Sequence, residues 1–99
     1  MLEIGAGAGR FTQILAGLGA QVLVADPSPG QLALNRQFAL AHGFAQAVPA
    51  WQQADICDLS YFGPDTFDAV VACGGPFSYV VDERDVALQE CLRVLRGQV

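Results

Sequence analysis

The sequence predicts an α/β fold built around a parallel β-sheet. Short apolar runs alternate with segments whose apolar residues recur at helical spacing, a pattern typical of βαβ units. The 99 residues suffice for one domain. Because 53% of the residues are hydrophobic and only 15% are charged, the composition excludes a disordered chain. We therefore expect a single folded domain over residues 1–99.

A strand over residues 1–4 and a helix over about residues 10–18 open the chain. The apolar residues of this helix recur at i, i+3, i+4 and i+7, which predicts one core-facing stripe. Gly19 is expected to follow the helix end, because glycine accepts a positive φ. The predicted stripe comprises Phe11, Ile14, Leu15 and Leu18.

A second strand and helix follow. The continuous apolar run over residues 22–25 is typical of a strand covered on both faces. Ser28 and Pro29 suit the N-cap and first position of a helix. This helix is expected to end near His42, a C-terminal cap or surface residue, with Gly43 closing it.

The second half of the chain predicts two more strands and one more helix. Pro49 before residues 50–53 suits an edge strand, which can spare a hydrogen-bond donor. Residues 67–73 predict a buried strand, and residues 82–96 predict a helix followed by Gly97. The core-facing stripe expected of this helix comprises Leu88, Cys91, Leu92 and Leu95.

The charge balance and the cysteine content exclude several classes of protein. The net charge is −5, lysine is absent and the arginines are scattered, whereas a nucleic-acid surface needs clustered cations. No apolar run reaches the ~18 residues of a membrane span, and no basic region of a secretory signal is present. Three cysteines without CxxC spacing and a single histidine argue against a disulfide framework and a zinc site. We therefore expect a cytoplasmic protein with free thiols, no metal, and no nucleic-acid or membrane partner.

Glycines at positions 5, 7 and 9 lie between the first predicted strand and the first predicted helix. Such a loop makes a tight turn, lets a ligand approach the backbone closely and directs free amide groups from the start of the helix. The loop alone does not choose among cofactors, because nicotinamide- and flavin-binding domains have the same requirement.

Two charged residues beside the loop separate these cofactors. The dinucleotide fingerprint G-x-G-x-x-G needs a glycine at its sixth position, where this chain has Arg10. Glu3 lies two residues before the first glycine. A negative charge there does nothing for a pyrophosphate but attracts a sulfonium or an ammonium group. The pattern therefore favours a cationic ligand.

Two aspartates follow later strands. Asp26 lies 21 residues after Gly5, close to the spacing of about 20 that places a carboxylate on ribose hydroxyls. The alternative is an acidic turn residue before Pro27. Asp55 follows the third strand, where it can accept the adenine amino group while Ile56 packs on the ring. The alternative is an aspartate that merely terminates the strand.

Taken together, these features resemble a class I, Rossmann-like S-adenosylmethionine-dependent methyltransferase of the small-molecule type. The match is specific because five segments agree in order and spacing. The resemblance implies a three-layer α/β fold, a parallel sheet with strand order 3-2-1-4, and S-adenosylmethionine as the cofactor. The five segments are residues 2–10, 24–28, 53–56, 67–72 and 92–97.

The resemblance also implies roles for individual residues. Asp26 would bind the ribose, while Asp55 and Ile56 would hold the adenine. Cys73 and Gly74 would border the sulfonium and the path of methyl transfer. The remaining expected cofactor contacts are Glu3, Gly5, Ala6, Gly7 and Gly9 around the methionine portion, and Pro27 after Asp26.

The resemblance covers the entire chain but only about the first half of the family's domain. No helix precedes the first strand, and Gly97-Gln98-Val99 replaces the Pro-Gly-Gly usual in the family. We therefore expect a partial domain, a fragment or truncated gene product without the family's C-terminal strands. Its fourth strand would be an apolar edge that favours self-association.

The acceptor of the methyl group is not identified by the sequence. Residues 73–77 lack the Asn/Asp-Pro-Pro-aromatic motif used for amino methylation of bases, which disfavours that substrate class. Phe77 and Tyr79 either line an acceptor pocket or pack in the core, and no residue is assigned as a general base. Three hypotheses remain: a methyltransferase with a small-molecule acceptor, a cofactor-binding module without independent activity, and a nucleotide-binding oxidoreductase domain. Glu3 and Arg10 oppose the third.

Overall fold

The computed structural model describes residues 1–64, 66–72 and 84–94. Four parallel strands form one sheet in the order β3-β2-β1-β4, which confirms the predicted topology. The strands are β1 (Leu2–Ile4), β2 (Leu23–Asp26), β3 (Trp51–Gln53) and β4 (Val70–Val71). The helices are α1 (Arg10–Gly17), α2 (Pro29–His42), the short 3₁₀ helix η1 (Ala45–Ala47) and α3 (Arg84–Val94).

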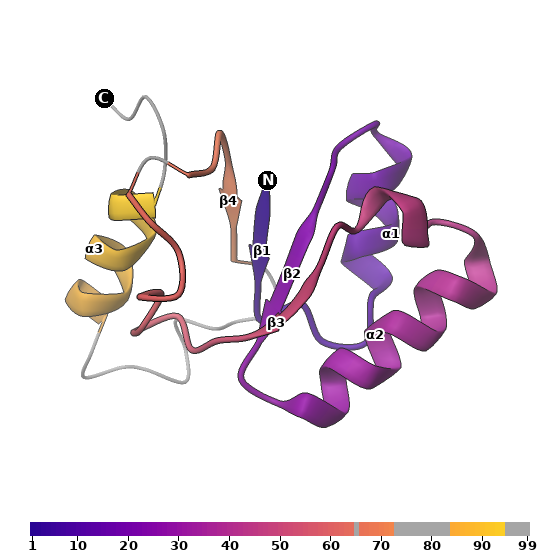
Figure 1. Cartoon of the computed structure of the whole chain (residues 1–99), viewed down its shortest axis with the longest axis horizontal. Coiled ribbons are helices and arrows are strands. Elements are labelled where there is room, and N and C mark those ends of the chain that lie inside the picture. The colour runs from indigo at the N-terminus through magenta and orange to yellow at the C-terminus, as the bar shows by residue number, and fades with distance from the viewer. Residues whose placement is uncertain (65, 73–83, 95–99) are drawn as a thin grey trace.

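The molecule has three layers, as predicted. Helices α1 and α2 cover one face of the sheet, and α3 lies on the opposite face (Figure 1). Side chains alternate between the two faces along a strand. Leu2 and Ile4 of β1 therefore pack on the α3 side, whereas Glu3 between them faces α1. This alternation brings a carboxylate into the interior of the molecule.

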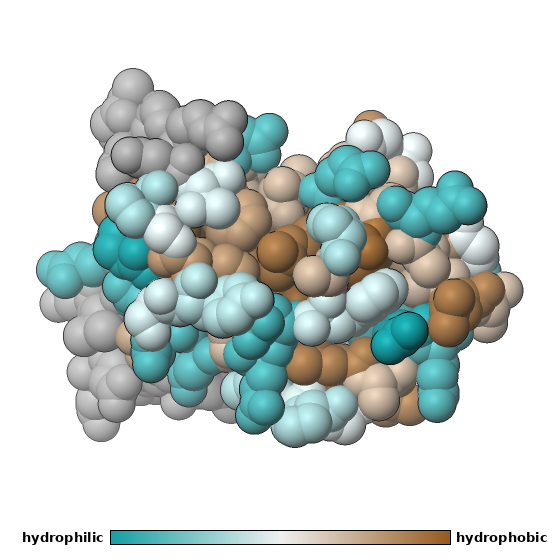
Figure 2. Space-filling model, viewed as in Figure 1, coloured by the Kyte–Doolittle hydropathy of each residue, from teal (hydrophilic) through white to brown (hydrophobic). Residues whose placement is uncertain are grey.

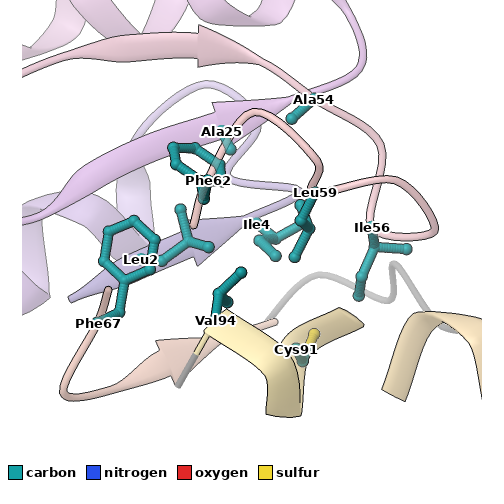
Figure 3. Close-up of a cluster of buried hydrophobic side chains, with 10 residues drawn as sticks. All are labelled: Leu2, Ile4, Ala25, Ala54, Ile56, Leu59, Phe62, Phe67, Cys91 and Val94. Atoms are coloured by element: carbon teal, nitrogen blue, oxygen red, sulfur yellow. The ribbon is translucent and has the colours of Figure 1, made fainter. Parts of the chain in front are cut away.

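The core is divided by the sheet into two hydrophobic clusters. On the α1 side, Leu15, Val22, Val24 and Val48 are buried together. On the α3 side, β1, the segment after β3 and α3 contribute the larger cluster (Figure 3). Its members are Leu2, Ile4, Ala25, Ala54, Ile56, Leu59, Phe62, Phe67, Cys91 and Val94.

The segment after β3 is tied to α3 through its backbone. The Arg93 guanidinium donates to the carbonyl oxygens of Leu59, at 2.7 Å, and Phe62, at 2.9 Å. The Glu90 carboxylate accepts the Leu59 amide at 2.6 Å and pairs with Arg93. These bonds fix the path of the chain that leads away from the end of β3.

Helix α2 begins and ends at the predicted residues. The Ser28 hydroxyl accepts the Gln31 amide at 3.2 Å, and Pro29 is the first helical residue. Gly43 ends the helix in the left-handed conformation, with φ of 78°. His42 is exposed in the last turn and its ring packs on Phe38. The prediction that His42 is a surface residue is confirmed.

Helix α1 turns a different face to the core from the one predicted. Leu15 is buried, but the other three apolar residues of the expected stripe are exposed. Thr12 takes a buried position instead, because its hydroxyl donates to the Glu3 carboxylate. In this orientation Thr12 and Leu15 face the interior together. The exposed residues are Phe11, Ile14 and Leu18, at 40%, 57% and 80%.

The fourth strand is shorter than predicted, and the described part of the last helix, Arg84–Val94, lies within the predicted range. Only Val70–Val71 pairs with β1, in the register Leu2 to Val70 and Glu3 to Val71, and the Phe67 amide before this strand donates to the Val94 carbonyl at the end of α3. In α3, Cys91 and Val94 are buried but Leu92 is 38% exposed, so its predicted place in the core is wrong. Residues 73, 82–83 and 95–97 of the predicted elements lie outside the described residues.

The surface carries scattered apolar side chains. On the face shown in Figure 2, apolar residues are interspersed with hydrophilic ones. Leu34, Leu40 and Tyr61 are among the exposed large side chains. Within residues 1–64, 66–72 and 84–94, no helix has the length and apolar character needed to cross a membrane.

Two leucines of α1 test the observed orientation of this helix. Leu15→Ala is expected to lower the free energy of unfolding by about 2–4 kcal/mol, because it leaves a cavity in the core. Leu18→Ala, at a position that is 80% exposed, is expected to change it by no more than about 0.5 kcal/mol. Urea unfolding followed by circular dichroism measures both. Equal losses would support the predicted stripe and contradict the observed orientation.

Candidate cofactor site

The loop between β1 and α1 depends on glycine at three alternate positions. Gly5, Gly7 and Gly9 have φ of 67°, 60° and 111°, in the left-handed region that other residues rarely adopt. A Cβ atom on Gly9 would also approach the Phe38 ring to 3.0 Å. Glycine is therefore required here both by the backbone conformation and by the packing of α2.

A cleft of about 350 Å³ opens between this loop and the first turns of α1. Most of its lining is apolar, and Glu3 and Arg10 are the two charged residues that line it. Phe11 and Ile14, which the sequence predicted in the core, form part of its wall. The full lining comprises Glu3, Gly5, Ala6, Ala8, Gly9, Arg10, Phe11 and Ile14. The structure thus brings four predicted site residues to one cleft: Glu3, Gly5, Ala6 and Gly9.

Glu3 is a buried acid in the wall of this cleft. Its side chain is 1% exposed, and Oε1 accepts the Thr12 hydroxyl at 2.5 Å. Burial raises the pKa of Glu3 above its ordinary value of 4.5, and the hydrogen bond from Thr12 partly opposes this shift. A cationic group bound in the cleft would therefore recover part of the free energy lost when the carboxylate left water.

The hydrogen bonds extend from Glu3 through two helices to the edge of the sheet. The Asn35 side-chain amide donates to the Thr12 hydroxyl at 3.1 Å and to the Gly7 carbonyl at 3.3 Å. The Trp51 indole donates to the Asn35 carbonyl oxygen at 2.9 Å. Asn35 and Thr12 are both 0% exposed. This chain of contacts connects β3, α2 and α1 to the glycine loop.

Asp26, at the end of β2, lies against the loop. Its Oδ2 accepts the Gly7 amide at 3.0 Å, and its Oδ1 accepts the Ser28 amide at 2.9 Å. The side chain is 7% exposed. Each carboxylate oxygen has more than one acceptor site, so a ligand hydroxyl can still bind beside the two backbone amides. Pro27 follows at the surface, where its carbonyl accepts from Gln53 at 3.1 Å.

The residues expected to hold an adenine ring lie in two different environments. Asp55 is exposed, and its Oδ1 accepts the Cys57 amide at 2.9 Å. Ile56 is 3% exposed and packs in the cluster on the α3 side (Figure 3). The structure therefore gives Ile56 a place in the core, and its contact with a ring stays a prediction. Cys73 and Gly74 lie outside the described residues, as do Phe77 and Tyr79.

Sequence reasoning missed Thr12 and Asn35. Both are polar residues on the buried faces of amphipathic helices, where α1 buries Thr12 with Leu15 and α2 buries Asn35 with Ala39. A polar residue three or four positions from a buried apolar one is the signal that could have found them. The preference for apolar residues alone selected the wrong face of α1.

The comparison with known proteins decides the family. A family model described as a methyltransferase domain matches residues 1–98. The chain belongs to the class I S-adenosylmethionine-dependent methyltransferases. The chain is 38% identical over 96 residues to a demethylmenaquinone methyltransferase of Clavibacter sepedonicus. The match covers 97% of this chain and 36% of that relative.

Solved structures agree with this assignment. An S-adenosylmethionine-dependent methyltransferase from Methanosarcina mazei superposes with a TM-score of 0.81 at 28% identity, over 96% of this chain and 46% of that one. A similar protein from Methanococcus maripaludis gives a TM-score of 0.84 at 18% identity, over 96% and 42% of the two chains, and shows the fold. The chain thus spans less than half of the length of these proteins.

The residues present fit S-adenosylmethionine, the cofactor of the family. The glycines leave space beside the loop that side chains would fill, and the cleft offers a buried carboxylate in a mostly apolar wall. A carboxylate in such a wall suits the sulfonium and α-ammonium groups of this cofactor. Asp26 supplies further acceptor sites next to the same loop.

Glu3 makes the stability of the folded chain depend on pH. An acid whose pKa is raised in the folded state contributes most stability below its unfolded value, near 4.5, and loses that contribution as pH rises through the folded value. In Glu3→Gln no group at this position ionises, so the stability of the variant does not fall with pH for this reason. We therefore expect the wild type to become steadily less stable than Glu3→Gln as pH rises from about 4 to neutral. Urea unfolding over this range measures the difference, and a difference independent of pH would contradict the assigned burial.

Proposed function

We propose that this methyltransferase domain binds S-adenosylmethionine at the β1–α1 loop and transfers its methyl group to a small-molecule acceptor in the cytoplasm. The observation that carries the proposal is the buried Glu3 carboxylate in the wall of a cleft formed by the glycine loop. Asp26, which binds the Gly7 amide, is proposed to hold the ribose, and Asp55 the adenine amino group.

Methyl transfer from a sulfonium requires little acid–base catalysis by the protein. The bound cofactor supplies a methyl group on a sulfonium, which is already a good leaving group. The chain's own residues hold the cationic ligand by charge, through Glu3, and orient it by hydrogen bonds to its hydroxyls, through Asp26. Positioning of the acceptor can then supply much of the rate. A general base is required only for an acceptor that must lose a proton.

Two observations support a small and partly apolar acceptor. The relative from Clavibacter sepedonicus is named for a demethylmenaquinone substrate. In this chain, Phe11 and Ile14 add apolar surface to the cleft that Glu3 lines. The arginines do not form a phosphate-binding cluster in the sequence, which supports neither nucleic acid nor an anionic surface as a partner.

A cofactor-binding module without independent activity is the second candidate. The described cleft is lined only by residues 3–14, and the chain spans 36% of its curated relative. Residues 1–99 are therefore proposed to form the cofactor-binding part of a methyltransferase domain. In the described sheet β4 is an edge strand, so we also propose that copies of the chain associate there.

Calorimetric titration tests the proposed ligand. S-adenosylhomocysteine, the product form of the cofactor, is expected to bind more tightly than NAD, because Glu3 repels a pyrophosphate and favours an ammonium group. Binding together with methylation of an added acceptor supports the enzyme, whereas binding without turnover supports the module. Tighter binding of NAD would contradict both.

A substitution of Asp26 tests the ribose contact. Asp26→Ala is expected to weaken S-adenosylhomocysteine about tenfold or more, because it removes a charged hydrogen-bond acceptor. Asp68→Ala, at an exposed aspartate, is the matched control. Adenosine and 2′,3′-dideoxyadenosine separate ligand recognition from loop support. If Asp26 only supports the loop, both nucleosides lose the same affinity, and the ribose role is refuted.

A further inference from the structure

The buried chain of hydrogen bonds from Trp51 to Glu3 has a defined direction. An indole N–H can only donate, so the atom of Asn35 that it contacts must be the carbonyl oxygen. The Gly7 carbonyl can only accept, so it must face the amide nitrogen of Asn35. Two partners of fixed polarity on either side therefore exclude the flipped amide.

The same logic fixes the proton of Thr12. The Asn35 amide has two protons; one points to the Gly7 carbonyl, and the other is donated to the Thr12 hydroxyl oxygen. A threonine hydroxyl has a single proton. Since Thr12 accepts from Asn35, that proton is available to Glu3, whose Oε1 lies at 2.5 Å. In the series Trp51, Asn35, Thr12 and Glu3, each residue therefore donates a hydrogen bond to the next one, and the series ends at the Glu3 carboxylate.

We infer that Asn35 and Trp51 are positioning residues for Glu3, which orient the Thr12 hydroxyl so that Glu3 presents an ionised carboxylate to the cationic part of the cofactor. Successive hydrogen bonds polarise one another, so a Thr12 hydroxyl that accepts from Asn35 is a stronger donor to Glu3. Thr12 and Asn35, which are both 0% exposed, thereby contribute to ligand binding as well as to packing. The effect on ligand binding rests on the proposed cofactor site, whereas the hydrogen-bond geometry does not depend on it.

Among the described residues, the series of hydrogen bonds that ends at Thr12 is the main source of hydrogen bonding to Glu3. Its neighbours in the sheet register are Val24 of β2 and Val71 of β4, which do not ionise. From α1 the charged residue that lines the same cleft is Arg10. At the end of β2, Asp26 lies against the glycine loop outside this lining, and its carboxylate accepts the backbone amides of Gly7 and Ser28. The Thr12 hydrogen bond is the interaction that lowers the pKa of Glu3, against the effect of burial.

Nuclear magnetic resonance of the ligand-free protein tests the inference. The chain has one tryptophan and three glutamates, so its single indole N–H signal and three ¹³C-glutamate carboxyl signals are readily separated. The indole signal of Trp51 is expected to follow the titration of Glu3 with the same midpoint. Glu3→Gln assigns the Glu3 signal and is expected to abolish this transition of the indole.

Two pairs of variants separate positioning from packing. Thr12→Val and Asn35→Leu keep the side-chain volume but remove hydrogen bonds, and both are expected to raise the pKa of Glu3. Thr12→Ser keeps the hydroxyl and is expected to restore the wild-type titration. Trp51→Phe removes the indole donor at the far end of the chain and provides a second test of the same direction of shift, should Asn35→Leu fold poorly.

The outcomes distinguish this inference from the proposed function. An indole signal that ignores Glu3, or a wild-type titration of Glu3 in both Asn35→Leu and Trp51→Phe, would overturn the inference. If the inference holds, Asn35→Leu should also weaken S-adenosylhomocysteine about fivefold near neutral pH, as expected for one lost hydrogen bond. Failure of the wild type to bind this ligand would instead refute the cofactor site, and the ligand-free titration would remain as measured.

Discussion

A carboxylate that is removed from water must be given hydrogen bonds or a counter-charge, and Glu3 imposes this constraint on the structure around it. The alternation of side chains along β1 places Glu3 on the α1 side, between two residues that build the opposite core. The Thr12 hydroxyl of α1 donates a hydrogen bond to this carboxylate, and the Asn35 amide of α2 donates one to the Thr12 hydroxyl. Two helices are therefore positioned by one buried acid.

The exposed apolar face of α1 follows from the same constraint. Because Thr12 must point inwards, Phe11 and Ile14 point towards the cleft, where they line a space beside the carboxylate. If α1 had buried the whole predicted apolar stripe, Thr12 would have faced away and Glu3 would have lost its hydrogen-bond donor. The chain thus gives up some apolar burial in α1, and the result is a cleft that combines one negative charge with apolar walls.

The glycine loop and the ends of α2 were predictable because single residues encode them, and the strand order was implied by the resemblance to the family. Gly5, Gly7 and Gly9 each need a conformation that their neighbours cannot adopt, and Ser28 and Gly43 mark helix ends locally. The orientation of α1 and the roles of Thr12 and Asn35 were not predictable in this way. They depend on contacts between residues up to 28 positions apart, which periodicity within one helix does not contain. The start of β4 at Val70 likewise depends on its long-range pairing with Leu2 of β1.

A chemical-shift titration tests the proposed cofactor site at the loop around Glu3. S-adenosylhomocysteine would be added to ¹⁵N-labelled protein, and every backbone amide would be followed together with the Asn35 side chain. We expect the largest shifts on the amides of Gly5, Gly7 and Gly9, with a smaller response at the Asn35 amide that contacts Gly7. Saturable shifts confined to residues away from this loop, with Gly7 and Asn35 unchanged, would contradict it.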